Sequence, residues 1–157
     1  MRQAFVMKKV LIVGIGNILM GDDGVGPYVV NRIVDSGCLL PENVEVMDGG
    51  TAGLDLLHAM QGREKIIIVD ALNVDDRPGS VYRFGPEKLG PAGNRMSLHE
   101  VGVRETIRVL RMMGENPKVE IVGIVPERIS ECGIHISRAV RESVPRAIEV
   151  ILDAAVH

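Results

Sequence analysis

One stretch decides the fold of this chain of 157 residues: Lys9-Val-Leu-Ile-Val-Gly14-Ile-Gly-Asn-Ile-Leu-Met-Gly21-Asp-Asp-Gly-Val-Gly26. Residues 9–14 form a short apolar run that ends in glycine, which is typical of a buried strand. A glycine-rich loop follows, and after it Val25, Val29 and Ile33 recur at the spacing of a helix with one apolar face. The stretch therefore predicts a strand, a loop and a helix, which is the opening of an α/β unit.

The rest of the chain repeats this alternation. Further strands are expected at residues 44–48, 65–70, 80–84 and 118–125, and further helices are expected to start near Thr51, Ser97 and Ser137. Ser97 and Glu100 have the spacing of a capping box. The run 65–70 is apolar almost throughout, as a central parallel strand is, whereas 80–84 alternates like an edge strand. These patterns predict one domain over residues 1–157, with a mainly parallel sheet and helices on both of its faces.

Composition and charge narrow the classes of function. The chain is 46% hydrophobic and 25% charged, with a net charge of −3, 3% aromatic residues and no Trp. These values argue against a nucleic acid partner. No apolar run reaches the roughly 20 residues that span a bilayer, and residues 1–7 do not resemble a secretory signal. Cys38 and Cys132 lack a metal-type spacing. We therefore expect a cytoplasmic protein with no membrane partner.

Two acidic residues and one histidine stand where strands end or a helix begins. Asp23 lies in the loop after the first strand, Asp70 ends the third, and His99 opens a later helix. Ligands of open α/β sheets bind outside the carboxyl ends of the strands, so these side chains should converge there. Two carboxylates and an imidazole suit a divalent metal or a metal-bearing substrate. The positive end of the helix should favour ionised Asp22 and Asp23 and keep His99 neutral, as a metal ligand must be.

Each of these residues also has a structural interpretation. Asp22 or Asp23 could be the N-cap of the first helix, with a side chain that accepts a backbone hydrogen bond. Asp70 could fix a loop as a hydrogen-bond acceptor, and a histidine in a first helical turn could be purely structural. The sequence alone leaves these interpretations open beside the metal site.

A nucleotide site is a further alternative. Gly14 and Gly16 after the first strand, with Asp48 at the end of the second, partly match a dinucleotide-binding fingerprint. The third glycine position of that fingerprint holds Leu19 instead. The acidic pair after the loop would also repel a pyrophosphate. We therefore prefer the metal site.

Five motifs in order resemble the hydrogenase maturation protease family. They are residues 14–26, Asp48-Gly-Gly-Thr-Ala-Gly53, Ile68-Val-Asp70-Ala, Ser97-Leu-His99-Glu-Val-Gly102 and Gly123-Ile-Val-Pro-Glu127. They extend from about Lys8 to the last helix, and residues 1–7 are extra to the pattern. The resemblance implies an α/β fold in three layers, a five-stranded, mostly parallel, twisted sheet with helices on both faces. It also implies an endopeptidase that removes the C-terminal extension of the NiFe hydrogenase large-subunit precursor after nickel insertion.

The resemblance assigns roles to the three converging residues. Asp23, Asp70 and His99 match the family's metal-binding positions, and we expect them to be both the catalytic residues and the metal ligands. The nickel is expected to be carried by the substrate precursor rather than permanently bound, although other divalent metals should be able to occupy the site. Whether a carboxylate or the metal activates the attacking water is left open, so the enzyme could be of aspartic or metal-dependent type.

The remaining expectations concern substrate and partners. Gly49, Gly50 and Thr51 lie on the same sheet edge and are expected to bind the substrate backbone, although they could also be a plain strand-to-helix turn. The expected partner is the large-subunit precursor, and the chain itself is expected to be a monomer or a weak oligomer. A nickel-checking module that binds the precursor without cutting it would carry the same ligands.

Overall fold

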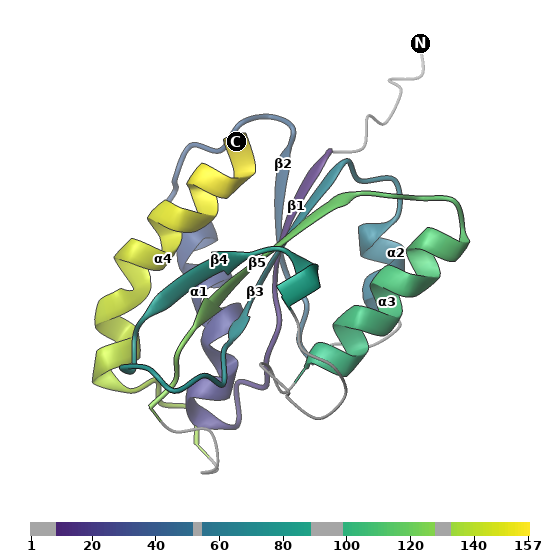
Figure 1. The fold of residues 1–157 in the computed structure, drawn as a ribbon. Coiled ribbons are helices and arrows are strands. Elements are labelled where there is room, and N and C mark those ends of the chain that lie inside the picture. Colours follow the sequence, from purple (N-terminus) through teal and green to yellow (C-terminus); the bar gives the residue numbers. More distant parts are fainter. Residues whose placement is uncertain (1–8, 52–54, 89–98, 128–132) are drawn as a thin grey trace.

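The computed structural model describes residues 9–51, 55–88, 99–127 and 133–157. Within these residues five strands form one twisted sheet in the order β2-β1-β3-β5-β4 (Figure 1). The strands are β1 (Val10–Gly14), β2 (Val44–Asp48), β3 (Lys65–Ala71), β4 (Val81–Phe84) and β5 (Lys118–Ile124). Only β4 runs antiparallel to its neighbour, and it lies at an edge of the sheet. The mostly parallel sheet and the edge position of β4 are therefore confirmed.

Helices cover both faces of this sheet. On one face lie α1 (Val25–Asp35) and α4 (Arg138–Val156), and on the other lie α2 (Asp55–Met60) and α3 (Glu100–Met112) (Figure 1). Two short 3-10 helices, η1 (Gly21–Gly24) and η2 (Pro86–Lys88), complete the described elements. The predicted three-layer architecture is confirmed. In the described part of the chain, no helix has the length and apolar character needed to cross a membrane.

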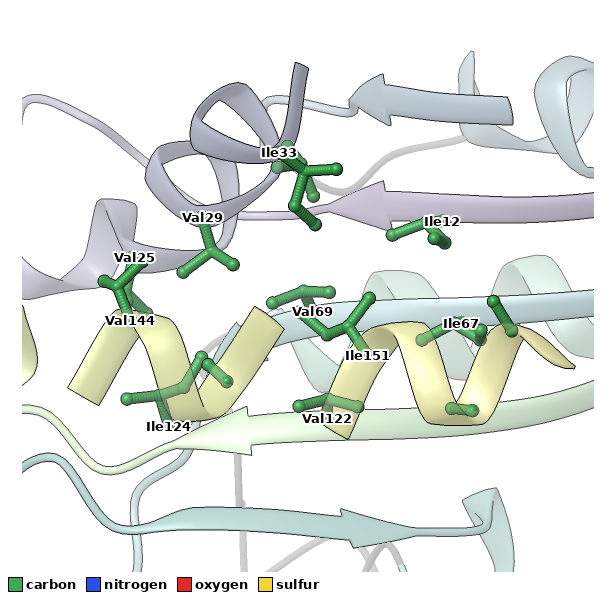
Figure 2. Close-up of a cluster of buried hydrophobic side chains, with 14 of the residues drawn as sticks. Ile12, Val25, Val29, Ile33, Ile67, Val69, Val122, Ile124, Val144 and Ile151 are labelled. Carbon is green, nitrogen blue, oxygen red and sulfur yellow. The ribbon is translucent and has the colours of Figure 1, made fainter. Parts of the chain in front are cut away.

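The alternation of side chains along the strands divides the core into two clusters. In β1, Val10 and Ile12 pack with α1 and α4, whereas Leu11 and Val13 pack with α2 and α3. Figure 2 shows the first cluster, to which α4 contributes Ile151. Both faces of β1 are buried, because a central parallel strand is covered by helices on each side.

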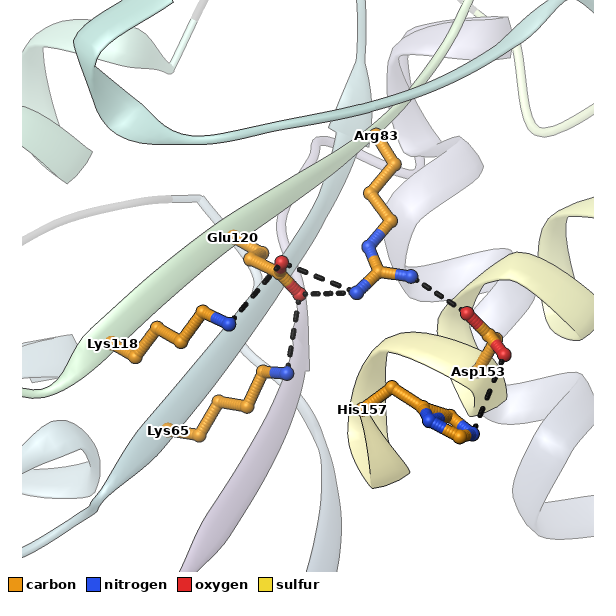
Figure 3. A network of polar contacts seen from close by, with 6 residues as sticks. All are labelled: Lys65, Arg83, Lys118, Glu120, Asp153 and His157. Carbon is orange, nitrogen blue, oxygen red and sulfur yellow. Dashed lines mark hydrogen bonds and ion pairs between the residues drawn. The ribbon is translucent and has the colours of Figure 1, made fainter.

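A network of ion pairs lies at the amino-terminal end of the sheet. Glu120 of β5 lies 3.3 Å from Lys65 Nζ and 3.1 Å from a guanidinium nitrogen of Arg83. Arg83 also pairs with Asp153 of α4 at 2.8 Å, and this contact ties the end of the last helix to the edge strand (Figure 3). Glu120 is thus a carboxylate shared between at least two cations.

Two predicted caps depend on residues outside the described part of the chain. Ser97 of the predicted capping box is one of them, and the structure has α3 begin at Glu100 with His99 as its N-cap. Residues 52–54, which separate Thr51 from α2, also lie outside it. The last helix begins at Arg138 with Ser137 as N-cap, so its predicted start is confirmed.

The sheet order creates a switch point beside β1. The chain passes from β1 to β2 on one side and returns to β3 on the other, since β1 lies between them. Crevices that bind ligands in open α/β sheets lie where the strand order reverses in this way, at the carboxyl ends of the strands. A ligand site is therefore expected at the carboxyl ends of β1 and β3.

Candidate active site

Asp23, Asp70 and His99 converge at this switch point. Asp23 is in η1 just after β1, Asp70 is near the carboxyl end of β3, and His99 stands at the start of α3. His99 Nδ1 lies 3.2 Å from Asp70 Oδ1, and His99 Nε2 lies 3.5 Å from Asp23 Oδ2. Three residues that are far apart in the sequence thus form one cluster, and their predicted convergence is confirmed.

Asp70 is buried, and its side chain has a local and a long-range contact. Its Oδ1 accepts a hydrogen bond from the backbone N–H of Ala71 at 2.8 Å and also faces His99 Nδ1. Only 3% of Asp70 is exposed, so its charge depends on such partners. Asp70 is therefore both a local hydrogen-bond acceptor, as its structural interpretation predicted, and a neighbour of His99. Asp70 fixes the orientation of the imidazole ring.

Asp23 differs from Asp70 in how its two oxygens are used. Oδ2 accepts a hydrogen bond from the backbone N–H of Asn17 at 3.0 Å and faces the His99 ring. Oδ1 is buried, and among the described residues it has no hydrogen-bond partner. A buried acceptor without a partner is costly, so a native structure that keeps one calls for an explanation. Asp23 Oδ1 is thus an unused acceptor on the carboxylate that faces His99.

The pKa of His99 corrects one expectation from the sequence. The hydrogen bond with Asp70 raises this pKa above its ordinary value of 6.5, burial opposes the rise, and the charges of Asp70 and Asp23 add to it. The direction is opposite to the one expected from the helix end alone, because the two carboxylates favour the charged ring. A metal that binds His99 must therefore displace a proton that is held more firmly than in a free imidazole.

The cluster has suitable donors for a metal, but they are not arranged as its ligands. In the described part of the chain, no three His, Cys, Asp or Glu side chains are placed to hold a metal ion together. The reason is that the His99 ring lies between the two carboxylates, with one nitrogen facing each. Imidazole and carboxylate groups do suit divalent transition metals. The role of Asp23, Asp70 and His99 as metal ligands stays a prediction, and it requires His99 to give up at least one of these contacts.

Asp22 is not the predicted cap of α1, and its carboxylate accepts hydrogen bonds from a distant part of the chain. The N-cap of α1 is Gly24, so the interpretation of Asp22 or Asp23 as that cap is wrong. Asp22 Oδ1 accepts a hydrogen bond from Ser137 N at 2.7 Å, and Oδ2 accepts bonds from Glu127 N at 2.8 Å and Ser137 Oγ at 2.7 Å. Sequence reasoning missed these contacts because both partners lie more than a hundred positions away.

The glycines of the first loop allow close packing of the chain on itself. A Cβ on Gly14 would lie 2.3 Å from the carbonyl oxygen of Gly26, and a Cβ on Gly16 would lie 2.1 Å from that of Asp23. The space beside Gly16 is thus filled by η1 rather than left for a pyrophosphate. Close packing alone explains the Gly14 and Gly16 pattern, so the nucleotide alternative loses the feature that suggested it.

Gly49, Gly50 and Thr51 lie at the same edge of the sheet as the cluster. Gly49 N donates to Gly14 O and Gly16 N donates to Gly50 O, each at 2.8 Å, which fastens this loop to the loop after β1. Gly50 has a φ of +57°, a left-handed conformation that favours glycine. Thr51 is exposed. Their position beside the cluster is as predicted, and their contact with a substrate stays a prediction.

The chain is similar to known proteins over most of its length. A family model described as hydrogenase maturation protease matches residues 27–154. The hydrogenase 2 maturation protease of Escherichia coli strain K12 is 35% identical over 150 residues, which cover 93% of this chain and 90% of that protein.

Solved structures give the same result. The hydrogenase maturating endopeptidase HybD from Escherichia coli superimposes with a TM-score of 0.83 at 35% identity, covering 93% of this chain and 91% of that one. The NiFe hydrogenase maturation protease HybD from Thermococcus kodakarensis gives a TM-score of 0.79 at 30% identity, covering 94% and 99%. Sequence and fold thus point to the same group of proteins.

Proposed function

The chain belongs to the hydrogenase maturation protease family, and from that premise we propose that it removes the C-terminal extension of a NiFe hydrogenase large-subunit precursor after nickel insertion. Its relatives are named as proteases and endopeptidases of hydrogenase maturation, which makes this chain a hydrolase of the same kind. The substrate, the role of nickel and a cytoplasmic location are the parts that we propose.

The buried, unpartnered Oδ1 of Asp23 carries this proposal. It lies on a carboxylate that also faces His99, at the switch point where α/β sheets bind ligands. An oxygen left without a hydrogen bond among the described residues has a cost in the free protein that a bound cation would remove. Nickel carried by the precursor supplies such a cation at the moment of substrate binding.

In the proposed reaction, nickel enters as part of the substrate. Asp23, Asp70 and His99 bind it once His99 has lost its proton and left one of its carboxylate contacts. A water molecule, activated by the nickel or by one carboxylate, adds to the scissile carbonyl carbon. The C–N bond then breaks, the amine of the tail takes a proton, and the peptide leaves. A precursor without nickel would give Asp23, Asp70 and His99 no metal to bind, so cleavage depends on completed nickel insertion.

Gly49, Gly50 and Thr51 are proposed to hold the substrate backbone. Their loop is fixed to the loop after β1 by two hydrogen bonds, so it lies in a defined position beside the cluster. No atom lies within 4 Å of where a Cβ of Gly50 would be, as far as the described residues show. A peptide can therefore approach the backbone there.

The test compares a nickel-loaded precursor with a nickel-free one and follows the mass of the large subunit. We expect the C-terminal peptide to be lost only from the nickel-loaded form. His99→Ala and Asp70→Ala should abolish this cleavage while the circular dichroism spectrum stays that of a folded protein, because both side chains belong to the cluster rather than to the apolar core.

The possible outcomes separate the alternatives. Cleavage of both precursor forms would keep the protease and remove the role of nickel. Binding of a cognate precursor without cleavage would favour a non-cutting, nickel-checking module. Normal cleavage by His99→Ala would show that the cluster is not the active site.

A further inference from the structure

Asp22 and Asp23 are neighbours in the sequence but face different parts of the molecule. They lie in η1, and consecutive residues of a 3-10 helix project roughly 120° apart. Asp23 faces His99, whereas Asp22 contacts the segment after β5 and the start of α4. Only 1% of Asp22 is exposed. Two adjacent buried carboxylates thus have separate partners.

The hydrogen bonds that Asp22 accepts from the described residues use both of its oxygens. Each donor is fixed by a larger element, because Ser137 is the N-cap of α4 and Glu127 follows β5 closely. A carboxylate that accepts several backbone and hydroxyl hydrogen bonds is held in one orientation. The backbone of η1 is therefore fastened to α4 and β5 through the Asp22 side chain.

η1 depends on such outside contacts for its position. It has four residues, and no side-chain cap bond is formed at its start among the described residues. A parallel bridge between Met20 and Gly133 gives a second attachment, with Gly21 N donating to Gly133 O at 2.7 Å. Both attachments join η1 to the chain that leads from β5 to α4.

We infer that Asp22 is a positioning residue for the active site: its bonds to Glu127 and Ser137 hold η1 so that Asp23 faces His99. The inference rests on the proposed function, because it treats Asp23 as part of the machinery that binds nickel. It adds Glu127, which follows β5, and Ser137, the N-cap of α4, to the residues that determine activity.

The first measurement follows the geometry of Asp23 without any substrate. The amide of Asn17 donates to Asp23 Oδ2, so its signal in a ¹H–¹⁵N spectrum reports where that carboxylate lies. In Asp22→Asn, one oxygen becomes an NH2 group that cannot accept a hydrogen bond, and we expect the Asn17 signal to shift and its hydrogen exchange to accelerate. Ser137→Ala removes the hydroxyl donor and keeps the backbone one, so its effect should be smaller and in the same direction.

The second measurement is single-turnover cleavage of the nickel-loaded precursor. A displacement of about 1 Å at a catalytic group costs on the order of 100-fold in rate, and we expect such a loss in the rate constant of Asp22→Asn at saturating precursor. The half-saturating precursor concentration should rise as well, because a displaced Asp23 would bind the nickel of the precursor less well. A residue that only contributed to stability would lower the folded fraction and leave the rate of folded molecules unchanged.

Glu120→Gln serves as the matched control. It also removes a charge from a partly buried carboxylate, but at the opposite end of the sheet. It should lower the unfolding midpoint without moving the Asn17 signal or the cleavage rate. If Asp22→Asn proves too unstable to study, Ser137→Ala decides the question by the same two measurements.

The outcomes distinguish this inference from the proposed function. A wild-type protein that leaves the nickel-loaded precursor intact contradicts the proposed function, whatever the Asn17 signal does. A wild-type protein that cleaves, with variants at Asp22 and Ser137 that keep both its rate and its Asn17 signal, overturns the positioning role. A slow Asp22→Asn with a displaced Asn17 signal supports both.

Discussion

At the scale of single residues, His99 is held by the two carboxylates that are expected to share nickel with it. Nδ1 is 3.2 Å from Asp70 and Nε2 is 3.5 Å from Asp23, and the hydrogen bond with Asp70 is the largest cause of the raised pKa. The metal-free site thus favours the charged form of the ring at the place where nickel would bring its own positive charge. Proton and metal compete for the same ring.

The titration of His99 tests this competition. In the metal-free protein the midpoint should lie above 6.5, because Asp70 and Asp23 favour the charged ring. Asp70→Asn removes the largest cause and should lower the midpoint. Nickel affinity should then fall as the pH decreases through the His99 midpoint, since only the neutral ring binds a metal. Imidazole chemical shifts measured by NMR against pH would give the His99 midpoint in wild type and in Asp70→Asn. A midpoint that Asp70→Asn leaves unchanged would contradict the proposed effect of Asp70 on the His99 pKa.

The sequence predicted which residues converge at the candidate site better than it predicted their ionisation and their hydrogen-bond partners. Asp23, Asp70 and His99 could be found because strand ends and helix starts are local patterns, and a parallel sheet brings them together. The direction of the His99 pKa shift could not be predicted, because it depends on distances between side chains from three elements. The partners of Asp22 are 105 and 115 positions away, and no local pattern carries that information.

At the scale of elements, glycines set how closely α1 packs on the sheet. A Cβ on Gly26 would lie 2.3 Å from Ile15 O and 2.4 Å from Val69 O, both of which are backbone atoms with little freedom to move. The helix can therefore sit directly over the switch point. The apolar face of α1 and the order of strand, loop and helix were predictable from residue spacing. The close approach of α1 was not, because the sequence shows only that the loop is rich in glycine.

Gly26→Ala tests the close approach. Alanine favours a helix by about 1 kcal/mol over glycine, but the clash with two backbone oxygens acts as overpacking, which costs about 1–3 kcal/mol. We expect a net loss in the free energy of unfolding, measured by urea denaturation. Gly133→Ala is the control, since no described atom lies within 4 Å of its Cβ, and its effect should stay within about 0.5 kcal/mol. A more stable Gly26→Ala would contradict the packing argument.

At the scale of the whole molecule, the two ends of the sheet serve different purposes. The carboxyl end holds the candidate site, where a carboxylate oxygen is left unpaired among the described residues. The amino end holds the ion pairs of Glu120 (Figure 3). Burial opposes the ionisation of Glu120, but Arg83 and Lys65 outweigh it and lower its pKa. This ion-pair network thus lies away from the candidate site.

Glu120→Gln should destabilise the protein by about 1–3 kcal/mol at neutral pH, because it leaves two partly buried cations without their shared partner. The sign of the pH dependence follows from the lowered pKa. The contribution of Glu120 is complete above the unfolded-state value near 4.5 and is lost as the pH falls through the lower folded-state value. The difference in unfolding free energy between wild type and variant should therefore shrink in acid. A difference that is independent of pH would show that Glu120 acts by packing alone.

The large sequence separation of the Asp22 contacts has a consequence for folding during synthesis. Ribosomes make the amino-terminal end first, so Asp22 and Asp23 leave the exit tunnel long before Glu127 and Ser137 exist. A nascent chain that has already formed its first strand and helix cannot yet fasten η1. The geometry of the candidate site is completed only when the last helix is made and docks. The protein thus completes its own folding before its candidate site can act on another chain.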